Sequence, residues 1–344
     1  MRYKIYFNDK WVCSPLALTD IHNNLFCLDD TKTNKKLKKL TLNGTRFTQY
    51  IPELLFSFGG LVAFKCRASL YFVLNPISGK SRCIPWPPTV PYVKGAYMCG
   101  MFFHPLASEF KLIFVHRDEY TEESYCWYYV YGSATNCWRR INTTPLFFWP
   151  TYRYDPVVVD MRLYWMVNLD RFTPIPNGSD DPCMHAVMVF DINSEELHTM
   201  PHPMLYLCHI NNFRDNHEMM ILFEMDKKLW LAQIIQQGGS GMDIWELNDH
   251  VNWSWVRRYN ICKSEIPKRH FIDSYMSKNF YTRRTKFFCI NKGMLLINWC
   301  SAELYLLDLS RKIIRKIPDK YTSSNHRGFY LCATYTCSLL IPNV

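Results

Sequence analysis

The histidine and cysteine spacings of this 344-residue chain are the first place to look for metal or catalytic chemistry. His198 and His202 are four residues apart, the spacing at which one face of a helix presents two metal ligands. They flank Met200-Pro201 at the end of a strand-like run, so no helix is expected there. Cys208 and His209 are adjacent, which suits few ligand geometries, and none of the 14 cysteines has C-x-x-C spacing. The sequence therefore predicts no metal and no cofactor.

Short catalytic motifs give an equally negative result. The sequence contains no G-x-S-x-G, H-E-x-x-H or phosphate-binding glycine loop. The glycine-rich stretch 237–242 joins two strand-like runs and opens no helix, so it is interpreted as a flexible connection. No catalytic residue is predicted.

The elements that would position any site follow a repeat of about sixty residues. An apolar run, a turn, a basic stretch and an Ile-Pro or Met-Pro ending recur along the chain, as in Leu70–Pro85 and Leu304–Pro318. Two positions of the repeat recur in parallel at intervals of 56 to 61 residues. The residue that ends each copy is Ile84, Ile141, Met200, Ile261 or Ile317, and the landmark that closes the apolar run is Asn75, Tyr131, Asp191, Asn248 or Asp308. A period of this length indicates a radial array or a solenoid.

Each repeat contains four runs rich in β-branched and aromatic residues and bounded by Gly, Asn, Asp or Pro. In one repeat these runs are 54–58, 61–64, 70–74 and 81–84; in another they are 287–290, 294–298, 304–307 and 313–317. No sustained helical periodicity appears. Four short antiparallel strands per repeat predict an all-β fold, a β-propeller with kelch-like four-stranded blades.

The two ends of the chain each supply half a repeat. Runs 24–30 and 38–42 have the character of the last two strands, and runs 329–335 and 337–341 that of the first two. We therefore expect six blades, the last one closed by N- and C-terminal strands; a seventh blade within 259–284 or 169–182 is the alternative. The predicted propeller domain is 20–344, and residues 1–19 have no assigned fold.

The formal net charge of +10 is explained by the last strand of most repeats. Lysine and arginine on an exposed sheet edge prevent pairing with other sheets. The basic residues of these strands are Lys35, Lys36, Lys38, Lys39, Lys80, Arg82, Arg139, Arg140, Arg257, Arg258, Arg311, Lys312, Arg315 and Lys316; the fourth repeat departs, with Glu195 and Glu196. No nucleic-acid partner is therefore predicted.

No apolar leader or 18-residue apolar run is present, so the sequence predicts no membrane association. We expect a protein of the cytoplasm, the nucleus or both, in which the cysteines are reduced thiols.

The residue sequence of the repeats resembles that of the F-box-associated domain of plant F-box proteins. The resemblance lies in Gly59–Phe64 with Asn75–Pro85, in Val189–Pro201, in Ile244–Ile261 and in the closing Tyr335–Leu340, and it covers about 24–341. It implies an interaction propeller that recognises the substrates of a Skp–cullin–F-box ubiquitin ligase. The family's F-box precedes this domain and begins with a Leu-Pro signature, which residues 1–23 lack. Direct binding of the Skp-family adaptor is therefore not expected.

Two classes of function remain open, a protein-binding module and an enzyme working at the mouth of a propeller channel. An enzyme should place acids, histidines or metal ligands at equivalent positions of successive repeats. The ends of the inner strands are mixed instead: Phe58, His104, Asp160, Asp226, Asn291 and Tyr335. This mixture favours binding of a target protein over catalysis.

The recognition face is predicted from the loops between repeats and between second and third strands, because a rigid scaffold positions such loops. Aromatic and arginine residues are the types enriched at binding hot spots. The candidates in these loops are Phe148, Trp149, Tyr152, Arg153, Arg269, Arg283 and Arg284. The arginines predict an acidic or mixed-charge protein segment as the ligand. For the aromatic residues, the alternative is that they fill the gap between blades.

Overall fold

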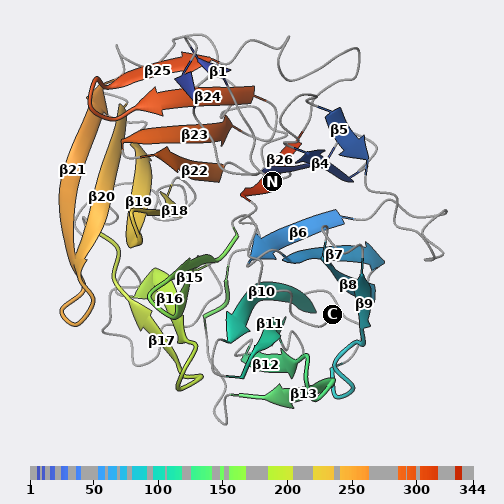
Figure 1. Ribbon diagram of the computed structural model, residues 1–344. Coiled ribbons are helices and arrows are strands. Elements are labelled where there is room, and N and C mark those ends of the chain that lie inside the picture. Colours follow the sequence, from blue (N-terminus) through green and yellow to red (C-terminus); the bar gives the residue numbers. More distant parts are fainter. Residues whose placement is uncertain are drawn as a thin grey trace. The chain divides into compact units, whose positions relative to one another are not determined.

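The computed structural model is built from β-strands, and no α-helix occurs among the residues that it describes (Figure 1). It describes residues 6–7, 10–11, 16–19, 25–29, 36–39, 53–58, 61–67, 70–75, 80–90, 96–104, 107–117, 125–141, 148–150, 155–167, 185–203, 220–235, 241–262, 286–291, 293–299, 303–316 and 330–334. Within these residues no helix is long and apolar enough to cross a membrane.

By its internal contacts the chain divides into two compact units. The first comprises Met1–Phe114, Tyr129–Arg139 and Ile317–Val344. The second comprises Val115–Tyr128 and Arg140–Lys316. Across the described residues, six sheets have four strands each, and five of them follow the strand succession predicted from the repeat.

Two sheets belong wholly to the first unit. One has the order β6-β7-β8-β9, with bounds Glu53–Phe58, Leu61–Arg67, Leu70–Leu74 and Ser81–Ile84. The other has the order β26-β3-β4-β5, with bounds Tyr330–Thr334, Leu16–Thr19, Leu25–Asp29 and Lys36–Lys39. This unit also contains a small hairpin, β1 (Tyr6–Phe7) with β2 (Lys10–Trp11).

The pairing of β26 with β3 joins the two ends of the chain in one sheet, as the half-repeats predicted. The division of that sheet differs from the prediction, because three strands come from the N-terminal end and one from the C-terminal end. The additional N-terminal strand, Leu16–Thr19, lies in the segment to which the sequence assigned no fold. The run predicted at 337–341 lies outside the described residues.

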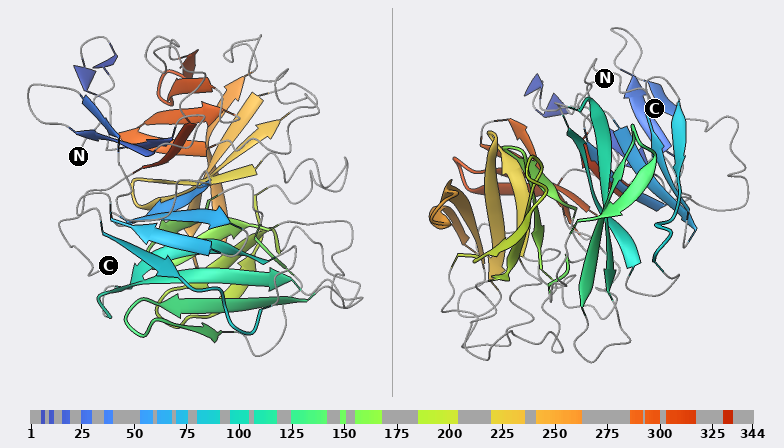
Figure 2. Two further views of the ribbon diagram at one scale, coloured as in Figure 1. Left: turned by 90° about the vertical axis from the view of Figure 1, so that its right-hand side faces the viewer. Right: turned by 90° about the horizontal axis from the view of Figure 1, so that it is seen from below.

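Three sheets belong to the second unit, and each follows chain order (Figure 2). The first runs from β14 (Val157–Val159) through β15 (Arg162–Met166) and β16 (Val187–Asp191) to β17 (Leu197–Met200). The second contains β18 (Met220–Met225), β19 (Lys228–Ile235), β20 (Gly241–Asp249) and β21 (Ser254–Cys262). The third contains β22 (Lys286–Asn291), β23 (Met294–Trp299), β24 (Glu303–Asp308) and β25 (Ile313–Lys316).

A sixth sheet contains β10 (Ala96–His104), β11 (Glu109–Arg117), β12 (Cys126–Gly132) and β13 (Cys137–Arg140). Its last strand is mostly exposed, as is β21, and two of the four residues of β9 and of β25 are exposed. Most of the described basic residues predicted on the outermost strands are exposed, namely Lys80, Arg139, Arg140, Arg257, Arg258, Arg311, Lys312 and Arg315, whereas Arg82 and Lys316 are partly buried.

Apolar side chains between consecutive sheets form the core of the second unit. One cluster joins β14–β17 to β18–β21 through residues such as Tyr164, Val189, Leu222 and Leu231. A second cluster joins β18–β21 to β22–β25. The first strands β14, β18 and β22 lie next to one another, and in the first unit β26, β6 and β10 do the same. Face-to-face packing of this kind stabilises sheets by removing apolar area from water, at about 25 cal/mol per Å².

The Pro that ends a repeat has a structural role in both units. In the first, the indole Nε1 of Trp138 on β13 donates a hydrogen bond of 2.7 Å to the Pro85 carbonyl after β9. In the second, Nε1 of Trp255 on β21 donates one of 3.0 Å to the Pro201 carbonyl after β17. The same donor and acceptor therefore link the outermost strands of neighbouring sheets 53 and 54 residues apart.

Candidate functional site

Two of the seven predicted recognition residues lie in the described part of the chain. Phe148 is only 8% exposed, its carbonyl accepts a hydrogen bond of 2.8 Å from the Tyr128 hydroxyl, and its ring stacks on His185 at 4.7 Å. The Phe148 side chain is therefore buried. Trp149 is partly exposed, and the Arg117 guanidinium lies 4.5 Å from its ring centre, a cation–π arrangement.

The remaining five candidates, Tyr152, Arg153, Arg269, Arg283 and Arg284, lie outside the described residues. Of the predicted set, the structure thus places only the neighbours Phe148 and Trp149. The pair formed by Trp149 and Arg117, the last residue of β11, was not anticipated from the sequence.

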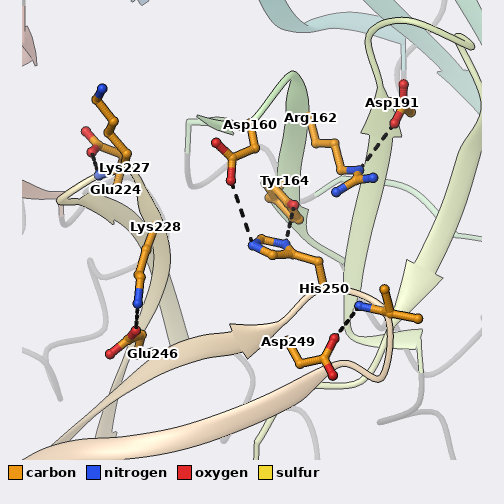
Figure 3. A network of polar contacts seen from close by, with 11 residues as sticks. Asp160, Arg162, Tyr164, Asp191, Glu224, Lys227, Lys228, Glu246, Asp249 and His250 are labelled. Carbon is orange, nitrogen blue, oxygen red and sulfur yellow. Dashed lines mark hydrogen bonds and ion pairs between the residues drawn. The ribbon is translucent and has the colours of Figure 1, made fainter.

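A charged network that sequence reasoning missed occupies the turns of the second unit (Figure 3). The turn between β14 and β15 has positive φ at Asp160 and Met161, and the turn between β18 and β19 has it at Asp226 and Lys227. Positive φ at two consecutive residues is the two-residue hairpin geometry that matches the twist of the strands. The Glu224 carboxylate accepts a hydrogen bond of 2.8 Å from the Lys227 amide across the second turn.

The tip of the β20–β21 hairpin contacts the neighbouring sheet through His250. Its Nδ1 lies 3.2 Å from the Tyr164 hydroxyl, with which it shares a hydrogen bond, and its Nε2 lies 4.0 Å from Oδ2 of Asp160 (Figure 3). Burial, with a smaller contribution from the positive charge of Arg162, lowers the pKa of His250 below 6.5. The imidazole is therefore neutral at physiological pH, and the contact is a neutral hydrogen bond.

Aspartates at three of the third-to-fourth strand turns hold the backbone in place. Oδ1 of Asp191 accepts from the amides of residues 193 and 194, and Oδ1 of Asp249 accepts from those of residues 251 and 252. Asp308 accepts from the amide of residue 311. These bonds account for the repeat landmark at Asp191 and Asp308, since Asp side chains commonly bond to backbone amides a few residues ahead. In the fifth repeat the residue that does so is Asp249, one position after the predicted landmark.

Arg162 connects one of these turns to the network. Its Nε donates a hydrogen bond of 3.2 Å to Oδ2 of Asp191. Burial opposes ionisation of Asp191, but the backbone amides and Arg162 together outweigh it and lower its pKa. His198 on β17 packs its ring on Trp253 of the hairpin at 5.5 Å, and burial lowers its pKa as well.

Two buried carboxylates on β20 bind the cations of the neighbouring strands. Glu246, whose side chain is 6% exposed, accepts hydrogen bonds from Lys228 Nζ and, at 2.6 Å, from Arg258 Nε. Asp243, whose side chain is 1% exposed, accepts a hydrogen bond of 3.3 Å from Arg257 and a hydrogen bond of 2.6 Å from the side-chain Nδ2 of Asn260. Buried charges are retained when they are paired in this way.

The chemistry available in the described part is hydrogen bonding and ion pairing. No group of three or more His, Cys, Asp or Glu side chains that could hold a metal occurs in that part. Burial raises the pKa of the Cys126 thiol to about 12 and that of Cys289 to about 11. Both remain protonated at neutral pH, and a protonated thiol is a poor nucleophile.

Comparison with known proteins places the chain in a family. No curated protein matches it. Among solved structures, an oligogalacturonate lyase in complex with manganese has a TM-score of 0.47 at 10% identity, over 86% of this chain and 70% of that one. The oligogalacturonate lyase from Vibrio parahaemolyticus scores 0.45 at 9% identity, over 94% and 85%. YCF48 bound to a D1 peptide scores 0.45 at 8% identity, over 92% and 84%. Scores this low assign no shared activity.

The model of the F-box associated beta propeller domain matches residues 14–340, which is nearly the whole chain. The match agrees with the repeated four-stranded antiparallel sheets and with the pairing of the two chain ends in one sheet. This chain belongs to the family of F-box associated beta propeller domains.

Proposed function

We propose that this chain is the target-recognition propeller of a Skp–cullin–F-box ubiquitin ligase system, and that it acts by binding a protein rather than by catalysis. The observation that carries the proposal is the family match over residues 14–340, because the family is an interaction propeller associated with F-boxes.

The proposed architecture is a six-bladed ring completed at the sheet that contains β26 and β3. The support for it is the pairing Tyr330↔Thr19 and Leu331↔Leu18, together with six four-stranded sheets in the described residues. Removal of residues 328–344 deletes β26 and leaves β3 as an unpaired inner edge, which is an aggregation hazard. We expect loss of cooperative unfolding or aggregation; a soluble truncated protein with an unchanged melting profile contradicts the closed ring.

Affinity capture from cell extract tests the recognition role. The chain of residues 1–344 is the bait, and captured proteins are identified by mass spectrometry, with Skp-family adaptors scored alongside to separate target binding from assembly into a ligase. The proposed ligand is an acidic or mixed-charge segment held by Arg269, Arg283 and Arg284. We expect their joint replacement by Ala to weaken capture of the target and to leave the fold unchanged.

A matched control removes the same charge elsewhere. Arg139, Arg311 and Arg315 are exposed arginines on or beside outermost strands, and their joint replacement by Ala lowers the net charge equally. Capture of the target should survive this change. If both triple variants lose the target to the same degree, the binding depends only on overall charge and the proposed recognition loops are wrong.

A further inference from the structure

The outermost strand β21 differs from the equivalent strands of the other sheets in its length. Ser254–Cys262 has nine residues. Each of the five other outermost strands has four: β5, β9, β13, β17 and β25. Because β21 ends its sheet, one row of its backbone N–H and C=O groups is directed away from β20, and no described strand pairs with that side. Such an edge can accept another strand.

The β20–β21 hairpin also reaches past β18 and β19 at its turn end (Figure 1). Five of the nine side chains of β21 are exposed, namely Ser254, Arg257, Arg258, Asn260 and Cys262. The β20–β21 pairing has two register shifts: one near the turn, between Leu247 and Asp249, and one near the middle of β21, where the pairing passes from Ile244↔Tyr259 to Trp245↔Arg257. Arg258 lies at this second irregularity, and the residues before and after it both pair with β20. The outer edge of β21 therefore consists of two short segments, one on each side of Arg258.

The charges on β21 act against pairing with a second copy of the same strand. An antiparallel pair of β21 strands centred on the bulge would bring Arg257 and Arg258 against the same two arginines. Like charges directly opposite each other destabilise strand pairs. Pairing with an acidic strand is favourable instead, because its carboxylates would lie beside these two guanidinium groups and attract them.

Each of the two arginines is fixed by a buried carboxylate through one nitrogen only. Arg257 uses an Nη atom toward Asp243 and Arg258 uses Nε toward Glu246, while their side chains remain 51% and 44% exposed. A guanidinium carries five N–H donors, so donors remain for a second partner. With Lys228 counted, three cations face two carboxylates, and the cluster keeps a net charge of +1.

We propose that the outer edge of β21 binds an extended acidic segment of a partner protein as an additional antiparallel strand. Main-chain hydrogen bonds supply affinity in this mode of recognition, and side chains supply specificity. Arg257 faces Trp245 and Asp243, whereas Arg258 faces Glu246, so the two point to opposite faces of the sheet. Successive side chains of a strand also alternate between faces. The segment that fits therefore has two consecutive acidic residues. None of the residues of this edge belongs to the predicted recognition set.

Peptides of one sequence frame test the proposal on the whole chain. The probe is a capped Thr-Val-Thr-Glu-Glu-Val-Thr-Val peptide, and its controls carry Gln-Gln or Lys-Lys at the centre. We expect the acidic peptide to bind about tenfold more tightly than the Gln-Gln peptide at low salt, a difference that salt reduces. A further control has the acidic sequence with alternate backbone nitrogens methylated, which keeps the charges and removes the main-chain donors. It should not bind.

Hydrogen–deuterium exchange locates the bound peptide. Amides within 254–262 should exchange more slowly in the complex, and those of the four-residue edge β17 should not change. Three results would overturn the proposal: binding of the N-methylated peptide with equal affinity, protection confined to other segments, or no binding by the acidic peptide. Because the probe is synthetic, a positive result stands even if capture from extract fails, and the two proposals can fail separately.

Discussion

The Glu246 carboxylate allows a direct test of how this family of sheets stabilises a buried charge. It is almost inaccessible to water and accepts hydrogen bonds from Lys228 and Arg258, whose side chains are about half exposed. Water can therefore solvate either cation if the acid is removed, but it cannot solvate the acid if both cations are removed. The structure thus predicts an unequal response to substitution.

The expected magnitudes follow from that inequality. Lys228→Met and Arg258→Met should each lower the free energy of unfolding by about 1 kcal/mol, because one cation still faces the acid and half-exposed ion pairs contribute little. The double variant leaves the carboxylate buried without a counter-charge, which costs about 3–5 kcal/mol. The double loss should therefore exceed the sum of the single losses. Adding Glu246→Gln removes the stranded charge and should recover about half of the double loss.

Urea unfolding of the four variants and the parent protein at neutral pH measures these differences as a double-mutant cycle. Burial opposes ionisation of Glu246, but Lys228 and Arg258 outweigh it and lower its pKa below 4.5. The stabilisation is therefore present above pH 4.5 and is lost as the pH falls through the lower, folded-state value. The parent and the single variant Glu246→Gln should converge in stability over that range. Additive losses, with no recovery on adding Glu246→Gln, would refute the reasoning.

Three further outcomes are expected. Trp255→Phe should cost about 1 kcal/mol more than Trp253→Phe, because only Trp255 donates its indole N–H to the preceding repeat; equal losses in urea unfolding would contradict this. Gln233→Met should raise stability by about 1 kcal/mol, since Oε1 of Gln233 is buried without a hydrogen-bond donor; a loss would indicate that the amide is satisfied. Because burial lowers the pKa of His250 below 6.5, the unfolded chain binds more protons below that pH, and stability should fall from pH 7 to about pH 5. His250→Gln should flatten this slope, and an unchanged slope would exclude the imidazole as its source.

The repeat predicted the strands well because its information is local. The runs 54–58, 70–74 and 294–298 correspond closely to β6, β8 and β23, since apolar alternation and bounding turn residues lie within each run. The strand Leu16–Thr19 escaped prediction because it is short and follows no repeat landmark. Its assignment depends on pairing with β26, more than 300 residues away in the sequence.

The charged network depends on register, which the sequence does not state. Glu246 meets Lys228 and Arg258 only because β20 pairs with β19 on one side and with β21 across a bulge on the other. A second shift between Leu247 and Asp249 moves the turn-holding side chain by one residue, which is why the landmark Asn248 is not the residue that bonds to the backbone. Local composition cannot reveal either irregularity. Phe148 illustrates the same limit, because its type fits both a hot spot and an interior position.

The hydrogen bonds from Trp138 to Pro85 and from Trp255 to Pro201 have a consequence for folding fidelity. The acceptor in both is a main-chain carbonyl, which any repeat could offer, so this contact does not distinguish the correct neighbour from another repeat. Discrimination must come from side chains that occur at one junction only, such as Arg82 donating to the Ser133 carbonyl in the first unit or His198 packing on Trp253 in the second. Repeated domains characteristically misassemble through interchangeable interfaces. Errors in the order in which blades associate should therefore increase when these individual side chains are lost, even where the shared tryptophan contact is intact.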